Sequence, residues 1–303
     1  MTTNPSNISF ATPSTSIRSK AVLVNLSISQ WVPKKLDASA SAQNNMLMGA
    51  SSRASVVVKQ LVPKDTIAPV IAAIGDTRNN WFYKRTLPWG DGGWRILPAA
   101  TYFDFVNEYN RKKQAFDAAV ESFVASYALA VDHAKTHMLG KLFNESDYPS
   151  AQHVRERFSM ELEFSPVPEG DDFRIDLGEN DRLALAQSLE LRIGRALREA
   201  ETDLWSRLRA PIENIVLRLT DTGTDGKPNA FKSTLISNLL EVVEAIPALN
   251  LSSDPTLENF RREAKDRLTM YTVEALKASP SARKEVVASA NDILGKLSRL
   301  NIA

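Results

Sequence analysis

The chain has 303 residues, of which 43% are hydrophobic and 24% charged, so it is long enough for one large or two ordinary domains and is not disordered as a whole. It contains no cysteine, which excludes disulfides, cysteine nucleophiles and thiolate zinc sites. The net charge of +1 hides an asymmetry: residues 1–98 contain eleven Lys or Arg and four Asp, a net +7, and the rest of the chain is therefore −6.

The first half of the chain begins with a polar stretch and continues with a predicted strand. Residues 1–19 are rich in Ser, Thr, Asn and Pro, so we expect a flexible arm, one that could also order against a neighbouring subunit. Residues 21–31 alternate apolar and polar side chains, which predicts a strand. Residues 36–52 have little periodicity and indicate a short helix or a loop, and the valines of residues 54–62 favour a second strand.

Two predicted helices are separated by a turn. Apolar residues three and four apart predict a helix over residues 66–86, with Asp65 as its N-terminal cap. Proline and glycines then indicate a turn, which a short strand follows near residues 93–97. Residues 99–143 predict a helix of about forty residues, which at 1.5 Å per residue would be roughly 60 Å long.

The second half of the chain is mostly helical. A short helix is expected near residues 150–157 and a strand at 160–164. The amphipathic residues 179–219 predict the natural antiparallel partner of the long helix, kinked or divided at Pro211. A Gly- and Asp-rich boundary at 221–228 precedes three helices, near residues 229–246, 255–277 and 280–299, which short loops should bring together as a bundle.

These elements predict a helix-dominated α+β fold, in which a small sheet packs on long antiparallel helices. We expect its strands near residues 20–31, 54–62, 93–97 and 160–164, and a C-terminal helical bundle on the same body. The predicted regions are the arm at 1–19, an α+β region at 20–178 and a helical region at 179–303. No segment reaches the roughly 18 apolar residues that a membrane span needs, so we expect no membrane partner.

The most informative motif is a stretch of cations and aromatic residues. Single-stranded nucleic acid is bound by cations along its phosphates and by aromatic rings that stack on its bases. Buried tryptophans covered by arginines would give the same pattern, so a structural role or a protein interface stays open. The candidate nucleic-acid-binding residues are Lys34, Lys35, Arg78, Trp81, Tyr83, Lys84, Arg85, Trp89, Trp94 and Arg95.

Motifs for catalysis or metal binding are weak. His133 and His137 are four residues apart on one helical face, as in some metal sites, but Ala134 stands where a zinc protease has glutamate. Acidic residues between Glu169 and Asp181 could hold a divalent cation or lie at a helix N-terminus. We therefore expect no cofactor and no catalytic residue, and we keep a metal-dependent enzyme as the third alternative.

Several short motifs together resemble a family of uncharacterised tailed-bacteriophage proteins, over about residues 20–220. They are Ala21–Trp31, Thr86–Trp89 with Gly92, Leu139–Phe143, Tyr148-Pro149 and Pro166–Pro168 with Asp172–Arg174. The resemblance implies a phage protein in the bacterial cytoplasm that serves phage DNA metabolism or takeover of the host. It assigns no site residue.

Two functions remain. The first is non-enzymatic binding of nucleic acid, most of all single-stranded DNA, through the basic N-terminal third. The alternative is a homo-oligomeric scaffold or an adaptor that binds a phage or host protein, because a basic face could equally dock on an acidic body.

Overall fold

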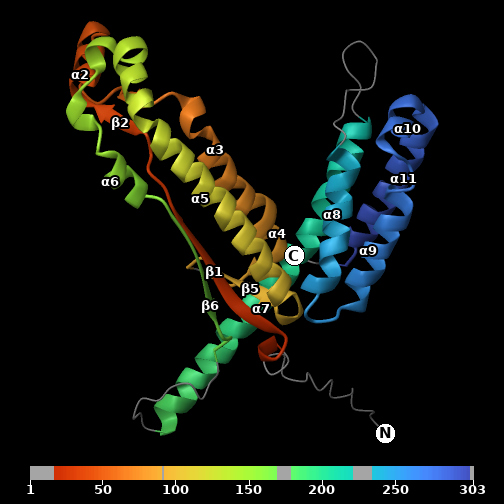
Figure 1. The fold of residues 1–303 in the computed structure, drawn as a ribbon. Helices are drawn as coiled ribbons and strands as arrows, with labels where there is room; N and C mark the ends of the chain where they lie inside the picture. Colours follow the sequence, from red (N-terminus) through yellow and green to blue (C-terminus); the bar gives the residue numbers. More distant parts are fainter. Residues whose placement is uncertain (1–16, 91, 169–178, 221–233, 301–303) are drawn as a thin grey trace, which may run out of the picture. The chain divides into compact units, whose positions relative to one another are not determined.

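The protein has the helix-dominated α+β fold that its sequence predicts (Figure 1). A computed structural model describes residues 17–90, 92–168, 179–220 and 234–300. Residues 1–16 of the predicted arm, the predicted boundary at 221–228 and the acidic residues from Glu169 to Asp176 lie outside the described residues. Ile17 is buried, so the described end of the arm is packed.

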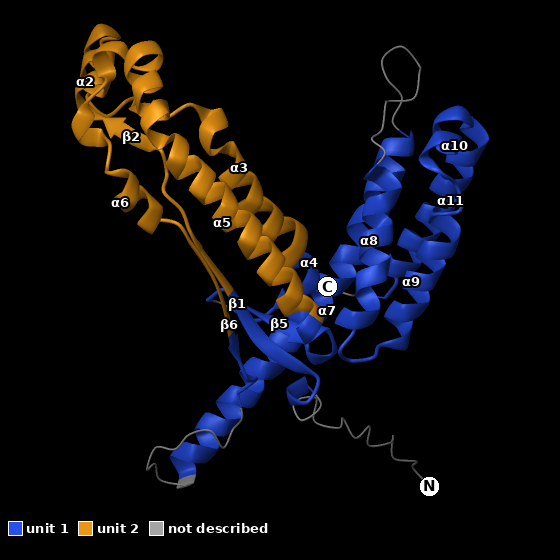
Figure 2. Ribbon diagram, in the orientation of Figure 1, with its two compact units in different colours: residues 1–25, 83–103, 164–303 blue, residues 26–82, 104–163 orange. Residues whose placement is uncertain are grey.

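The chain forms two compact units, and each is built from segments distant in sequence (Figure 2). Unit 1 comprises residues 1–25, 83–103 and 164–303, and unit 2 comprises residues 26–82 and 104–163. This differs from the expected division at residue 178, because residues 20–103 contribute to both units. The chain crosses between the units within strands and helices, where composition has no boundary.

A four-stranded sheet has the order β4-β5-β1-β6. Its strands are β1 (Ala21–Ser29), β4 (Leu87–Pro88), β5 (Trp94–Pro98) and β6 (Ser159–Ser165). β1 runs antiparallel to β5, with Ala21 opposite Pro98 and Asn25 opposite Trp94. The predicted strands at 20–31, 93–97 and 160–164 are confirmed, whereas the predicted strand at 54–62 lies in another sheet.

That second sheet belongs to unit 2 and has two antiparallel strands, β2 (Lys34–Asp37) and β3 (Val57–Gln60). Helix α2 (Ala38–Leu47) connects them. The Asp37 side chain caps this helix by accepting a hydrogen bond from the Ala40 backbone N–H. The ambiguous stretch at 36–52 is thus a helix, although its hydrophobic periodicity is weak, because a cap and its flanking strands define it.

Helix α5 (Tyr102–His133) is the longest helix of unit 2. Its buried face, which includes Phe116, Val120 and Phe123, packs with apolar residues of helices α3 (Lys64–Gly75) and α6 (Ala151–Glu156). A π-helical segment, η3 (Ala134–Met138), continues α5. The helix stops short of the predicted residue 143, because Gly140 adopts a positive φ of 48°, a conformation that favours glycine and ends helices.

The cap predicted for α3 is wrong. Pro63 occupies the N-cap position, and Asp65 lies within the first turn, where its charge favours the helix dipole. The helix ends at Gly75, and a π-helical segment, η1 (Asp76–Phe82), and the short α4 (Tyr83–Arg85) follow it.

Unit 1 contains the predicted C-terminal bundle. Helix α7 (Glu179–Thr220) packs against α8 (Thr234–Leu249), α9 (Pro255–Leu268) and α11 (Pro280–Ser298). A short helix, α10 (Val273–Ala278), occupies the end of the region predicted as one helix at 255–277. The 179–219 helix, expected as the partner of α5, buries its apolar face in the core of unit 1, whereas α5 contributes to the core of unit 2. Periodicity identifies a buried face but not what covers it. Pro211 lies within α7 and does not divide it.

The helices of the described residues include none with the length and apolar composition needed to cross a membrane.

Candidate protein-binding surface

The two faces of the β2–β3 sheet differ in chemistry. Successive side chains of a strand point to opposite faces, so Lys35 and Asp37 share one face and Leu36 lies on the other. The register places Lys59 opposite Lys35 and Val58 opposite Leu36. One face of this small sheet is therefore charged and the other apolar.

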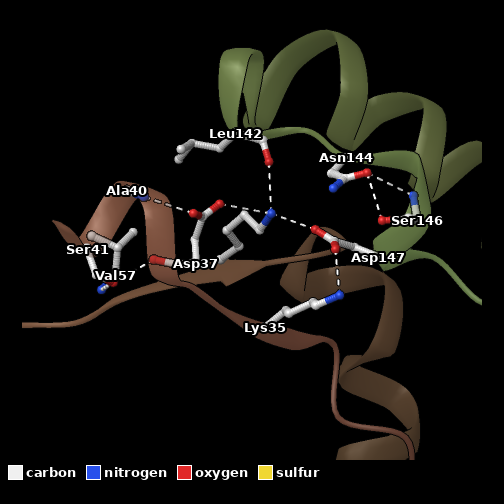
Figure 3. Close-up of polar contacts among 10 residues, drawn as sticks. Lys35, Asp37, Ala40, Ser41, Val57, Leu142, Asn144, Ser146 and Asp147 are labelled. Carbon is white, nitrogen blue, oxygen red and sulfur yellow. Dashed lines mark hydrogen bonds and ion pairs between the residues drawn. The ribbon is translucent and has the colours of Figure 1, made fainter. Parts of the chain in front are cut away.

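The charged face is held against residues 142–147 by a buried ion network (Figure 3). The Lys59 ammonium lies 2.5 Å from Asp147 Oδ2 and 3.1 Å from Asp37 Oδ2, and it donates a third hydrogen bond to the Leu142 carbonyl at 3.0 Å. Lys35 Nζ lies 2.7 Å from the other Asp147 oxygen. The side chains of Lys59 and Asp147 are only 5% and 3% exposed. Because each buried charge has a partner, the network fixes which face of the sheet points inward.

The pKa values follow from this geometry. Burial alone would raise the pKa of Asp147, but hydrogen bonds from Lys35 and Lys59 outweigh it and lower the pKa below its usual value of 3.8. The Asp147 hydrogen bond likewise raises the pKa of Lys59 against the effect of its burial. Asp147 and Lys59 are consequently both ionised near neutral pH.

The opposite face exposes large apolar side chains. On this face Leu36 is 54% exposed and Val58 52%. Helix α2, which connects the two strands, adds the exposed residues Met46 (85%) and Leu47 (84%). We define the apolar surface as the exposed residues Val32, Leu36, Met46, Leu47, Met48, Val56 and Val58. Isolated exposed leucines are ordinary, but seven large apolar residues within residues 32–58 are typical of an interaction surface.

Buried amide contacts position the end of α2 that presents Met46 to Met48. The Asn45 side chain is buried; its amide nitrogen donates to the carbonyls of Ser52 and Ser55, and its oxygen accepts the Ser55 backbone N–H. The hydroxyl of Ser41 accepts a hydrogen bond from the Val57 backbone N–H. The helix, the turn after it and β3 are thus one connected structure at the end of unit 2 where α5 finishes (Figure 1).

The predicted nucleic-acid-binding residues are divided between the two units. Lys34, Lys35, Arg78 and Trp81 lie in unit 2, and the other six lie in unit 1. Trp81 is buried, with its ring centroid 4.4 Å from that of Phe105, and Trp89 is buried in the core of unit 1. Trp94 packs, partly buried, against the same core. Both buried tryptophans are core residues and present no open ring for base stacking, which agrees with the structural role that the sequence left open.

Part of the stretch is exposed in unit 1. The Arg95 guanidinium lies 4.9 Å from the centre of the Tyr83 ring, which is 43% exposed, and donates to the Thr86 hydroxyl at 2.6 Å. The pKa of Arg95 is lowered mainly by its burial, and next by the positive charge of the nearby Arg207. Arg85 is exposed, and Lys84 pairs with Glu241 at 2.7 Å.

The charge asymmetry along the sequence does not separate into one basic and one acidic unit. Unit 2 contains 13 Lys or Arg and 13 Asp or Glu, and unit 1 the remaining 24 and 23. The excess of cations in residues 1–98 is thus balanced within each unit by acids from later in the chain.

The two histidines lie together on the helix surface. The rings of His133 and His137 stack at 5.0 Å, and His137 Nδ1 lies 2.6 Å from the Thr136 hydroxyl. No group of three or more His, Asp or Glu that could hold a metal ion exists among the described residues.

Sequence reasoning missed the ion network and the apolar surface. Lys59 and Asp147 are separated by 88 residues, and neither stands in a motif. Three consecutive apolar residues, Met46 to Met48, within an otherwise polar segment could have indicated the surface. No protein-family model, no curated protein and no solved structure matches the chain.

Proposed function

We propose that this is a non-enzymatic adaptor that binds another protein through the apolar surface of unit 2. One observation supports the proposal: a buried ion network fixes the inner face of the β2–β3 sheet, while the outer face leaves Leu36 and Val58 half-exposed. A register slip of β2 by one residue would exchange its faces, turning Leu36 inward and Lys35 and Asp37 outward. The network opposes that slip, so the exposure is a fixed property of this fold.

The energetic argument concerns what covering the surface would contribute. Removing apolar area from water contributes about 25 cal/mol per Å², and fully burying one side chain of this size contributes about 1.5–3 kcal/mol. The cost of association offsets part of that gain. The net gain in binding free energy is what remains after that cost is subtracted.

A displayed library of random peptides, selected on the immobilised full chain, tests the proposal. We expect enriched peptides to bind the wild type at least tenfold more tightly than the Leu36→Ser/Val58→Ser variant. Leu129→Ser is the matched control, because Leu129 is an exposed leucine of the same unit on α5. Peptides that bind all three proteins equally, or a library without enrichment, would rule out this surface as a protein-binding site.

We propose nucleic-acid binding as a second function, and its support is the exposed residues Tyr83, Lys84 and Arg85 of unit 1. The half-exposed Tyr83 ring lies beside exposed Lys84 and Arg85, a combination suited to one stacked base and its phosphates. Fluorescence anisotropy of a labelled single-stranded oligonucleotide should then show binding that weakens steeply between about 50 and 200 mM salt. The variants Tyr83→Ala and Arg85→Ala should each reduce the affinity for the oligonucleotide. An affinity that neither variant changes would contradict the proposal.

The phage context that the sequence resemblance implies remains a proposal too. An adaptor of this kind would serve a phage by binding a phage or host protein, and the peptides selected above would provide sequences to compare with such partners.

A further inference from the structure

We infer that the partner segment on the apolar surface is an amphipathic helix whose polar side chains are acidic. This inference rests on the proposed adaptor function and specifies its partner. It follows from the charges around the surface and from the side chains within it.

Lys34 shares a face of β2 with Leu36, and the exposed charges of residues 32–58 are positive. Lys34 and Arg53 are exposed, and neither takes part in an ion pair among the residues that the structure describes. The one carboxylate within residues 32–58, Asp37, lies on the inner face and pairs with Lys59. A ligand on the apolar surface therefore meets cations and no exposed carboxylate from this segment.

Charge complementarity favours an acidic partner over a second copy. Two copies that met through this surface would bring Lys34 and Arg53 of both chains together, and like charges at an interface are unfavourable. Acidic side chains around an apolar stripe would instead pair with them. Such pairs select the partner and raise the rate of association.

The side chains of the surface favour a helix over nucleic acid. Residues 32–58 contain no Phe, Tyr or Trp, so no ring is present to stack on bases. Met46 and Met48 have flexible thioether side chains, which adapt to the uneven apolar face of a helix. Leu36 and Val58 lie opposite each other on the two strands and add apolar area.

Two synthetic helical peptides test the inference. They share one leucine face and carry either glutamate or lysine at the remaining positions, and their affinities for the full chain are measured by fluorescence anisotropy at about 150 mM salt. We expect the glutamate peptide to bind at least tenfold more tightly than the lysine peptide. The variant Leu36→Ser/Val58→Ser should bind the glutamate peptide at least tenfold more weakly than the wild type does.

Charge reversal identifies the residues responsible. The variant Lys34→Glu/Arg53→Glu should reverse the preference between the peptides. The control Arg192→Glu/Lys284→Glu makes the same change in charge at two exposed positions of unit 1 and should leave the preference intact. Circular dichroism and thermal melting of each variant confirm that it is folded.

The remaining outcomes separate the two claims. Equal binding of both peptides, lost in Leu36→Ser/Val58→Ser, would leave the adaptor function standing and overturn the acidic partner. Binding of neither peptide overturns the inference, and the displayed library then decides the adaptor function. Light scattering would identify a second copy as the occupant of the apolar surface if the mass doubled as the protein concentration rose, and if Leu36→Ser/Val58→Ser stayed at the monomer mass. Binding to phosphatidylserine vesicles without binding to the glutamate peptide would identify a lipid surface.

Discussion

Lys59 shows how a charged side chain can be a core residue. Its ammonium donates to two carboxylates and one backbone carbonyl, so each of its three N–H donors has an acceptor although the group is buried. A buried pair of this kind contributes little net stability against an apolar pair of the same size, but the loss of one partner is costly. Its role is accordingly to specify one orientation of the β2–β3 sheet.

Replacing one partner of this pair should destabilise the protein more than replacing both. We expect Asp147→Ala to lower the free energy of unfolding by about 3 kcal/mol, because it leaves Lys59 buried without its closest partner. The double variant Asp147→Leu/Lys59→Met should lose less than Asp147→Ala alone. Urea unfolding followed by circular dichroism measures both, and a double variant that is less stable than the single variant would contradict this account.

The same network predicts a dependence of stability on pH. The Ala40 N–H and then Lys59 lower the pKa of Asp37, and the pKa of Asp147 is lowered as well. A carboxyl group whose pKa is lowered by folding stabilises the fold at any pH above its pKa in the unfolded chain, which is near 3.8. This contribution is lost as the pH falls through the lower pKa of the folded protein. Lys59, whose pKa is raised, contributes below its usual 10.5 and loses this contribution as the pH rises further.

As the pH falls below about 4, wild type should therefore lose stability more steeply than Asp147→Ala does, because the variant lacks one of the groups that must be protonated. Thermal melting across this range provides the comparison. Parallel curves for the two proteins would show that Asp147 does not titrate as described.

The tryptophans of the basic aromatic stretch should behave as core residues. Trp81→Ala should cost about 3–5 kcal/mol of unfolding free energy, because it leaves a cavity beside Phe105. Tyr83→Ala should cost at most about 1 kcal/mol, the value of its contact with Arg95 at a half-exposed site. Urea unfolding of the two variants measures the difference, and equal losses would place both rings in the same environment.

Among single elements, the long amphipathic helices are the most predictable. The 179–219 prediction matches α7 within one residue at its C-terminal end, because Leu204, Leu208 and Ile215 repeat on one face that is buried. Pro211 does not divide this helix, and Leu208 and Ile212 on either side of it are buried in the core of unit 1. Helix α2 was uncertain because its definition comes from Asp37 and Asn45, whose partners lie outside any apolar pattern.

Helix α9 offers a direct test of capping. Asp254 accepts a hydrogen bond from the Thr256 backbone N–H at 2.8 Å, and Pro255 occupies the first turn. We expect Asp254→Ala to lower the unfolding free energy by about 1 kcal/mol, while Asp254→Asn, which keeps a capping oxygen, should lose clearly less. Chemical denaturation compares the three proteins; an equal loss in both variants would show that the cap contributes nothing.

For the whole molecule, sequence periodicity predicted the fold class and most elements but not the two units. Unit 2 combines residues 26–82 with residues 104–163 around one core that contains Ile67 and Phe123. No linker, repeat or change of composition marks this pairing. The candidate site was missed for the same reason, because its inner face depends on contacts between residues far apart in the chain.

The separate cores predict a local response to a core mutation. Phe123→Ala should raise amide hydrogen exchange in both segments of unit 2, including helix α3, because one core joins them. Helices α8 and α9 belong to the other core, that of unit 1, and should change much less. Hydrogen exchange read by mass spectrometry gives this pattern, and a uniform increase along the chain would show that the cores unfold together.

The central claim is that residues 32–58 form the surface that binds an acidic amphipathic helix. Its most direct test is amide hydrogen exchange of the full chain with and without a saturating concentration of the glutamate-faced peptide. The account predicts slower exchange in α2 and the adjoining strands β2 and β3, and no such change in Lys34→Glu/Arg53→Glu at the same peptide concentration. Protection that falls instead on another part of the chain, with residues 32–58 unchanged, would contradict it.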